Sequence, residues 1–83
     1  MRKLERIILK LINKYAQNKD IKPNPKLELK NDLGYTSLNF VCLIMEIEAH
    51  FDFQFEDEYL NMDKLSTIDD IIQYVNTVVP DYE

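Results

Sequence analysis

The sequence predicts an all-α protein, a small four-helix bundle of three long helices and one short one, with a long loop between helices one and two. Its composition predicts this, because the 83 residues include one glycine and three prolines and 46% are hydrophobic. Apolar residues also recur at helical spacing in three long segments. No internal repeat divides the chain, so we expect residues 1–83 to form a single domain.

The first helix is predicted by an amphipathic segment near the N-terminus. One apolar stripe should be buried, and its members are Leu4, Ile7, Ile8, Leu11, Ile12 and Tyr15. Residues 18–32 should form a loop, because Pro23 and Pro25 cannot continue a helix. Three leucines in or beside this loop should anchor it to the core: Leu27, Leu29 and Leu33.

A second helix is predicted over about residues 37–51, and a helical wheel gives it two opposed apolar stripes. The expected core stripe comprises Phe40, Leu43, Ile44, Ile47 and Phe51. The opposite stripe comprises Leu38, Val41, Cys42, Met45 and Ala49. A bundle helix in so short a chain usually buries one stripe, so the second should contact a ligand or a partner protein. A central helix covered on both sides explains the pattern equally well.

The C-terminal part predicts one short element and one long one. An acidic turn or short helix is expected at about residues 56–61. The last helix should begin at Ser66 or Thr67, whose side chains can cap it, and Pro80 should help to end it. Its expected buried stripe comprises Ile68, Ile71, Ile72, Val75 and Val79.

Charge is distributed unevenly along the chain. Residues 1–30 hold nine of the ten basic side chains and three acids, whereas residues 31–83 hold one basic side chain and twelve acids. An acidic surface attracts basic partner proteins and repels the phosphates of nucleic acids. The first helix could contact anionic lipid or nucleic acid, but its cations are scattered, so a solvated polar face is the favoured interpretation.

Several classes of protein are excluded. No apolar run is long enough to cross a bilayer, and no secretion signal is visible, because the chain is charged from Arg2 onward. The single cysteine, Cys42, cannot form an internal disulfide and fits a reducing compartment. We therefore expect a cytoplasmic monomer with no stable membrane insertion and no nucleic acid partner.

The segment Asp32-Leu33-Gly34-Tyr35-Thr36-Ser37-Leu38 is the strongest functional signal. It places Ser37 at the start of the second helix, beside unpaired N–H groups and the positive end of the helix dipole. A phosphate ester on that hydroxyl would be stabilised there, so the position suits a covalent attachment point better than a catalytic nucleophile. The alternative is that Thr36 or Ser37 merely caps the helix.

Other candidate sites are weaker. His50 and Cys42 lie too far apart on the wheel for a base and a nucleophile to make contact. The acids of residues 56–58 lack the spacing and the glycine of a calcium loop, and no glycine-rich loop could bind nucleotide phosphates. We therefore expect no catalytic residue and no metal ligand.

From Asp32 to Val75 the chain resembles the acyl carrier proteins. The matching residues are Asp32-Leu33-Gly34, Ser37-Leu38, Val41, Leu43, Ile44, Met45, Glu48, Phe51, Leu65, Ser66-Thr67-Ile68, Ile71, Ile72, Tyr74 and Val75. The resemblance implies a single carrier-protein domain over residues 1–83, with 4'-phosphopantetheine attached covalently to Ser37 and no catalysis by the chain itself. It also implies a face for partner enzymes, formed by Thr36, Leu38, Val41, Met45 and Glu48.

The implied partners are a phosphopantetheinyl transferase, a ligase that loads acyl or aminoacyl groups, and synthase enzymes with basic docking patches. Glu48 is expected to be an exposed charge whose reversal would barely change stability. Two departures from the family leave the cargo open. Thr36 stands where acyl carriers usually have aspartate, and Tyr35 stands where peptidyl carriers usually have a second glycine. The competing interpretation is a helical adaptor that is never modified.

Overall fold

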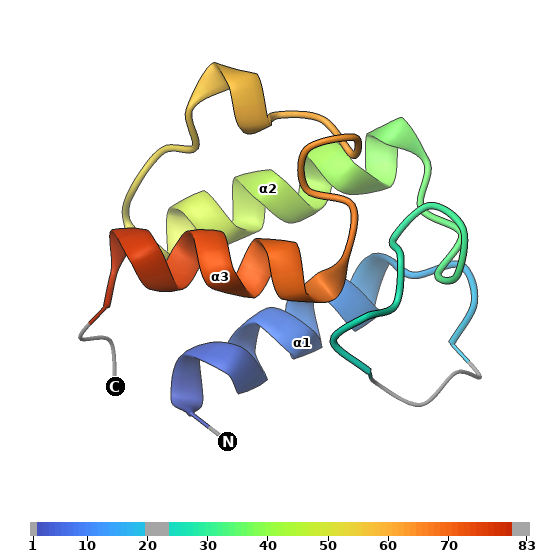
Figure 1. Cartoon of the computed structure of the whole chain (residues 1–83), viewed down its shortest axis with the longest axis horizontal. Coiled ribbons are helices and arrows are strands. Elements are labelled where there is room, and N and C mark those ends of the chain that lie inside the picture. The colour runs from blue at the N-terminus through green and yellow to red at the C-terminus, as the bar shows by residue number, and fades with distance from the viewer. Residues whose placement is uncertain (1, 20–23, 81–83) are drawn as a thin grey trace.

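The computed structural model describes residues 2–19 and 24–80. Figure 1 shows its elements in chain order: α1 (Lys3–Tyr15), α2 (Ser37–Phe51), the 3-10 turn η1 (Asp57–Tyr59) and α3 (Ile68–Val78). The all-α class is confirmed, but the count of four helices is slightly wrong. Three α-helices are present in the described residues, and the expected fourth is a single 3-10 turn, too short to pack as a bundle helix. The predicted helix breaker Pro23 lies outside the described residues.

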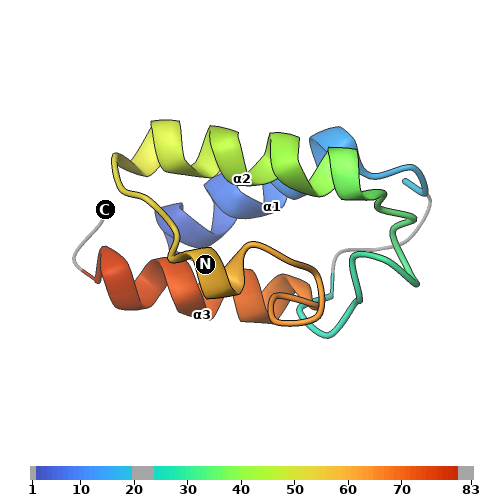
Figure 2. The same ribbon diagram turned by 90° about the horizontal axis from the view of Figure 1, so that it is seen from above.

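The helices form a compact bundle in which α1 runs antiparallel to α2 and α3. Figures 1 and 2 both show α2 and α3 beginning at the end of the bundle where α1 finishes. The loop before α2 therefore meets the end of α1, which is where the candidate serine lies. No helix in the described part of the chain combines the length and the apolar character needed to cross a bilayer.

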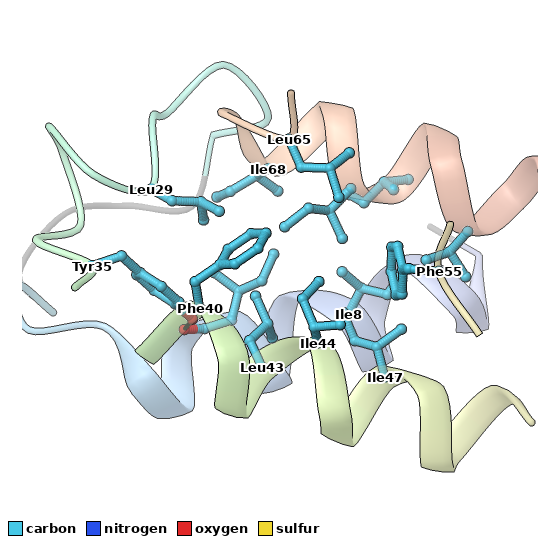
Figure 3. Packing of buried hydrophobic residues seen from close by; sticks show 14 of the residues in the cluster. Ile8, Leu29, Tyr35, Phe40, Leu43, Ile44, Ile47, Phe55, Leu65 and Ile68 are labelled. Carbon is cyan, nitrogen blue, oxygen red and sulfur yellow. Dashed lines mark hydrogen bonds between the residues drawn. The ribbon is translucent and has the colours of Figure 1, made fainter. Parts of the chain in front are cut away.

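The core is built from one face of each helix, largely as predicted. Leu4, Ile8 and Ile12 of α1 are buried, with the other three members of the predicted stripe half-buried around them. The predicted core stripe of α2 is buried throughout. Figure 3 shows its residues meeting Ile8 from α1 and Ile68 from α3. Helical periodicity was sufficient to predict these buried residues because each helix packs one side against the rest of the bundle.

The loop between α1 and α2 is anchored at two points. Leu29 is fully buried, Leu33 is buried and Leu27 is half-buried, so the predicted anchoring is confirmed. The backbone N–H of Leu29 donates to the carbonyl of Ser66 at 2.8 Å, and that of Ile68 donates to the carbonyl of Leu27 at 3.1 Å. These hydrogen bonds tie the loop to the start of α3.

Of the two residues expected to cap α3, Ser66 and Thr67, the structure shows that Thr67 is the N-cap. Its hydroxyl oxygen accepts a hydrogen bond from the N–H of Asp70 at 3.0 Å, and the Asp70 carboxylate accepts from the N–H of Thr67 at 3.1 Å. This reciprocal capping box begins the helix at Ile68. The helix ends at Val78, so Val79, which was expected in its buried stripe, lies beyond it and is only half-buried.

Candidate functional site

Thr36 caps α2, which leaves Ser37 as the first residue of the helix. Thr36 is extended, and its hydroxyl oxygen accepts from the N–H of Asn39 at 3.1 Å. The Thr36 N–H donates in return to the Asn39 side-chain oxygen at 3.0 Å. Of the two residues expected to cap, Thr36 therefore satisfies the first-turn donor.

Ser37 is exposed, and its hydroxyl makes no hydrogen bond to any residue among 2–19 and 24–80. The N–H groups of Ser37 and Leu38 belong to the first turn, where no carbonyl of the helix can accept from them. The hydroxyl thus stands at the positive end of α2 without a structural task. This arrangement is suited to esterification by an anionic group.

A glycine turn places this serine. Gly34 has φ of +71°, in the left-handed region, and a Cβ added there would lie 3.0 Å from the Cβ of Gln17. The crowding arises because the N–H groups of Gln17 and Asn18 both donate to the carbonyl of Leu33, at 2.9 Å and 3.1 Å. The end of α1 and the start of the site loop are therefore joined backbone to backbone.

Tyr35 joins the same two segments from the inside, which sequence reasoning missed. Its side chain is 3% exposed, and its hydroxyl donates to the carbonyl oxygen of Ile12 at 2.5 Å. The Ile12 carbonyl is one of the last four carbonyl groups of α1, for which the helix itself supplies no N–H donor. Burial raises the pKa of Tyr35, so the hydroxyl stays protonated as a donor. A single aromatic residue between Gly34 and Thr36 shows no periodicity that could reveal this contact.

Replacing Tyr35 with phenylalanine should remove this hydrogen bond and leave the shape of the core intact. We expect Tyr35→Phe to cost about 1–3 kcal/mol of unfolding free energy, because a buried carbonyl loses its partner. The measurement is urea denaturation. Tyr59→Phe is the matched control: Tyr59 is half-buried, and in the described chain its hydroxyl makes no hydrogen bond. Equal losses in the two variants would contradict a specific role for the Tyr35 hydroxyl.

The second apolar stripe of α2 is exposed except at Cys42, which is half-buried. Leu38 is 70% exposed, Met45 is 63% exposed and Val41 is also exposed; we call these three residues the exposed α2 stripe. The interpretation in which neighbouring helices cover both sides of α2 is therefore wrong for the described chain. Beside the stripe lies a depression of about 170 Å³, lined by Phe40, Val41, Ile44, Met45, Glu48 and Leu60. Its apolar rim extends the stripe toward η1.

Glu48 is not the free exposed charge that was expected. Its side chain is half-buried, and the carboxylate accepts a hydrogen bond from the N–H of Phe55 at 2.9 Å. The contact forms because Asp52 ends α2 in the left-handed region, with φ of 58°, and turns the chain back along the helix. Glu48 therefore fixes the segment that leads into η1, so we now expect its charge reversal to lower stability by more than an exposed charge would.

The stability effect of changing Glu48 should depend on the acceptor more than on the charge. Glu48→Gln keeps a side-chain oxygen for the Phe55 N–H, whereas Glu48→Lys removes the acceptor and should cost about 1–3 kcal/mol. Thermal or urea unfolding measures the difference. Glu58→Lys reverses an exposed charge on η1 and should stay within about 0.5 kcal/mol of wild type. A loss as large in Glu48→Gln as in Glu48→Lys would assign the effect to charge.

Three further titratable residues of α2 were weighed as candidates or lie near the site: Glu46, Cys42 and His50. Glu46 accepts from the Tyr15 hydroxyl and pairs with Lys14 at 2.9 Å, and these two contacts hold the pKa of Glu46 below its usual value. Cys42 is half-buried, and His50 is exposed with its ring packed edge-on against Phe51. Residues 2–19 and 24–80 contain no group of three His, Cys, Asp or Glu residues that could hold a metal ion. Glu46 thus serves to join α1 to α2.

Comparisons with known proteins show which family the chain belongs to and which fold it shares. Residues 3–75 match the family model described as a phosphopantetheine attachment site. The chain is 44% identical over 66 residues to an acyl carrier protein of Chlorobium phaeobacteroides, covering 78% of this chain and 80% of the relative. It is 37% identical over 76 residues to an acyl carrier protein of Buchnera aphidicola, covering 92% and 94%. A solved structure of a putative acyl carrier protein from Mycobacterium tuberculosis superposes with a TM-score of 0.73 at 26% identity, covering 92% of this chain and 96% of that one.

Proposed function

The chain belongs to the acyl carrier protein family, and we propose that it tethers biosynthetic intermediates as thioesters on a 4'-phosphopantetheine arm joined covalently to Ser37. The observation that carries this proposal is the exposed hydroxyl of Ser37, which no described residue engages, at the first position of α2. Members of the family are carriers rather than catalysts. The arm supplies a terminal thiol for an acyl, aminoacyl or peptidyl group, and partner enzymes do the chemistry.

The surroundings of Ser37 fit a phosphodiester. The first-turn N–H groups and the helix dipole favour its negative charge. Thr36 provides the cap without a carboxylate, so no negative charge on the adjacent residue opposes the phosphate. The departure from the usual aspartate therefore leaves the helix start intact. What it removes is one charge that a modifying transferase could read.

The exposed α2 stripe is the proposed face for partner enzymes, and it begins at the residue after Ser37. Leu38, Val41 and Met45 offer apolar area, and the nearby Leu60 on the η1 side is exposed as well. Thr36 borders this face, and Glu48 lines the depression beside it. The exposed acids of residues 56–58 would favour partners with basic patches, chiefly through the rate of association. These partners would be a phosphopantetheinyl transferase, a loading ligase and synthase enzymes.

We also propose that residues 1–83 act as one carrier domain and that the protein works as a cytoplasmic monomer. The core supports the first point, since it joins residues from Leu4 to Val75 in one cluster. For the cytoplasmic location the support comes from the sequence, in which the single thiol, Cys42, fits a reducing compartment.

Co-expression with a broad-specificity phosphopantetheinyl transferase tests the proposal. Intact-mass analysis should show one added phosphopantetheinyl group, and peptide mapping should place it on Ser37. If the unmutated protein gains no mass with any competent transferase, the adaptor interpretation replaces the carrier. In that case the exposed α2 stripe would be a plain protein interface and Ser37 an idle surface residue.

A further inference from the structure

The outward face of α1 carries a row of cations that the carrier function does not use. Lys3, Arg6 and Lys10 follow one another at helical spacing, and all three side chains are exposed; we call them the α1 basic row. The row lines a shallow depression of about 690 Å³, together with Ile7, Leu9, Asn13 and Lys19. Ile7 and Leu9 are half-buried against the core, so they form an apolar floor between the cations.

Within residues 2–19 and 24–80, no acid neutralises these cations. In that part of the chain the lining of the depression contains no carboxylate, and the three side chains make no ion pair or hydrogen bond. Three further basic side chains of the region make contacts: Lys14 pairs with Glu46, Arg2 donates to the carbonyl of Pro80 at 3.0 Å, and Lys19, which also lines the depression, donates to the carbonyl of Lys14 at 3.5 Å. Glu5, the one acid of α1, accepts from the Arg2 N–H at the start of the helix. Positive charge is therefore concentrated on this one face.

We propose that the α1 basic row docks the protein on the surface of a bilayer that contains anionic phospholipids. Each Lys or Arg held at such a surface raises the partition constant about fivefold, so three cations contribute roughly a hundredfold. An exposed ion pair with a carboxylate of a partner protein contributes less than about fivefold, because two long side chains must be held in one geometry. Lipid headgroups diffuse to meet the cations, which makes the bilayer the better match for an open, shallow face.

The acidic remainder of the chain does not cancel this attraction. Residues 31–83 carry twelve of the fifteen acids, but the molecule extends over 31 × 28 × 18 Å. At physiological salt, charges separated by more than about 8 Å of solvent are largely screened. The electrostatic attraction to a bilayer therefore depends mainly on the charges of the face turned toward it. The net charge of the whole protein does not predict that attraction.

Docking through α1 leaves the candidate carrier site accessible. The depression on α1 shares no residue with the exposed α2 stripe or with the depression beside it. Ile7 and Leu9 are the apolar side chains that line the depression. Because both already pack against the core, neither is free to insert deeply into a bilayer. The contact is therefore peripheral and reversible, and it does not depend on modification of Ser37.

Vesicle co-sedimentation tests this proposal with the whole protein. The probes are unilamellar vesicles of phosphatidylcholine alone and of equal parts phosphatidylcholine and phosphatidylglycerol. The test variant removes the row with Lys3→Gln, Arg6→Gln and Lys10→Gln. The matched control removes three exposed cations elsewhere, with the same change in net charge: Lys26→Gln, Lys30→Gln and Lys64→Gln. Circular dichroism verifies that both variants keep the helical fold.

Wild type and control should bind the anionic vesicles and not the neutral ones, and added salt should release them. The test variant should bind roughly a hundredfold more weakly. The proposal is overturned if wild type does not bind anionic vesicles, if both triple variants lose the same affinity, or if the test variant keeps the affinity of wild type. Tighter binding of wild type to polyglutamate or to single-stranded RNA would also overturn it, by assigning the row to an acidic protein or a nucleic acid.

Discussion

Ser37→Ala should abolish phosphopantetheinylation completely while leaving the free energy of unfolding within about 0.5 kcal/mol of wild type. The first part follows because the alanine has no oxygen on which the ester can form. The second follows because Thr36 satisfies the first-turn donor of α2, so the Ser37 hydroxyl stabilises nothing among the described residues. Intact mass after incubation with transferase and coenzyme A measures the modification, and urea denaturation measures the stability.

Thr36→Ala is the reciprocal control for this prediction. It should lose the side-chain cap on Asn39 and cost about 0.5–2 kcal/mol, yet the protein should still gain mass on Ser37. A mass gain in Ser37→Ala would move the attachment to another nucleophile. A large stability loss in Ser37→Ala with none in Thr36→Ala would show that the cap was assigned to the wrong residue.

Ile47→Ala and Met45→Ala should differ strongly although the two residues lie on the same helix. Ile47 is fully buried in the core, so truncation should cost about 2–5 kcal/mol by removing packed atoms and leaving a cavity. Met45 is 63% exposed, so its truncation should cost less than about 1 kcal/mol. Met45→Ala should instead slow arm transfer, because it removes apolar area from the exposed α2 stripe.

Urea denaturation and the rate of modification by transferase together separate these effects. Ile47→Ala should lower the free energy of unfolding measured with urea. Under conditions in which this variant remains folded, its rate of modification by the transferase should stay near that of wild type. If Met45→Ala unfolded the protein while Ile47→Ala was benign, α2 would have to face the core with its other side.

Much of the fold could be predicted from the sequence because the buried face of a helix appears as apolar residues spaced three or four apart. The spacing of apolar residues identified the buried face of all three helices and the boundaries of α2. The same spacing predicted a second stripe of Leu38, Val41, Cys42, Met45 and Ala49. Whether that stripe was covered was a question of which elements lay nearby, and periodicity within one helix carries no information about that.

The contacts that position the site could not be predicted, because each joins residues distant in the chain. Tyr35 reaches the carbonyl of Ile12, and Tyr15 reaches Glu46 on a different helix. Glu48 accepts from Phe55 only because the chain reverses after α2. The sequence alone marked Tyr35 only as a residue that stands where peptidyl carriers usually have glycine, and it predicted that Glu48 is an exposed charge. Neither residue lies in a local sequence pattern from which its hydrogen-bond partner could be predicted.

The sequence by itself therefore determined the all-α class, the core faces of the helices and the candidate serine at the start of α2. These depend on spacing and on first-turn hydrogen bonding, which act over a few residues. The structure decided that Thr36 caps α2, through a contact with Asn39 three residues along the chain. Tertiary structure alone decided that the Ser37 hydroxyl makes no hydrogen bond among the described residues and that Leu38, Val41 and Met45 are uncovered. These last two points depend on which distant segments the chain brings together, and spacing along one helix does not reveal that.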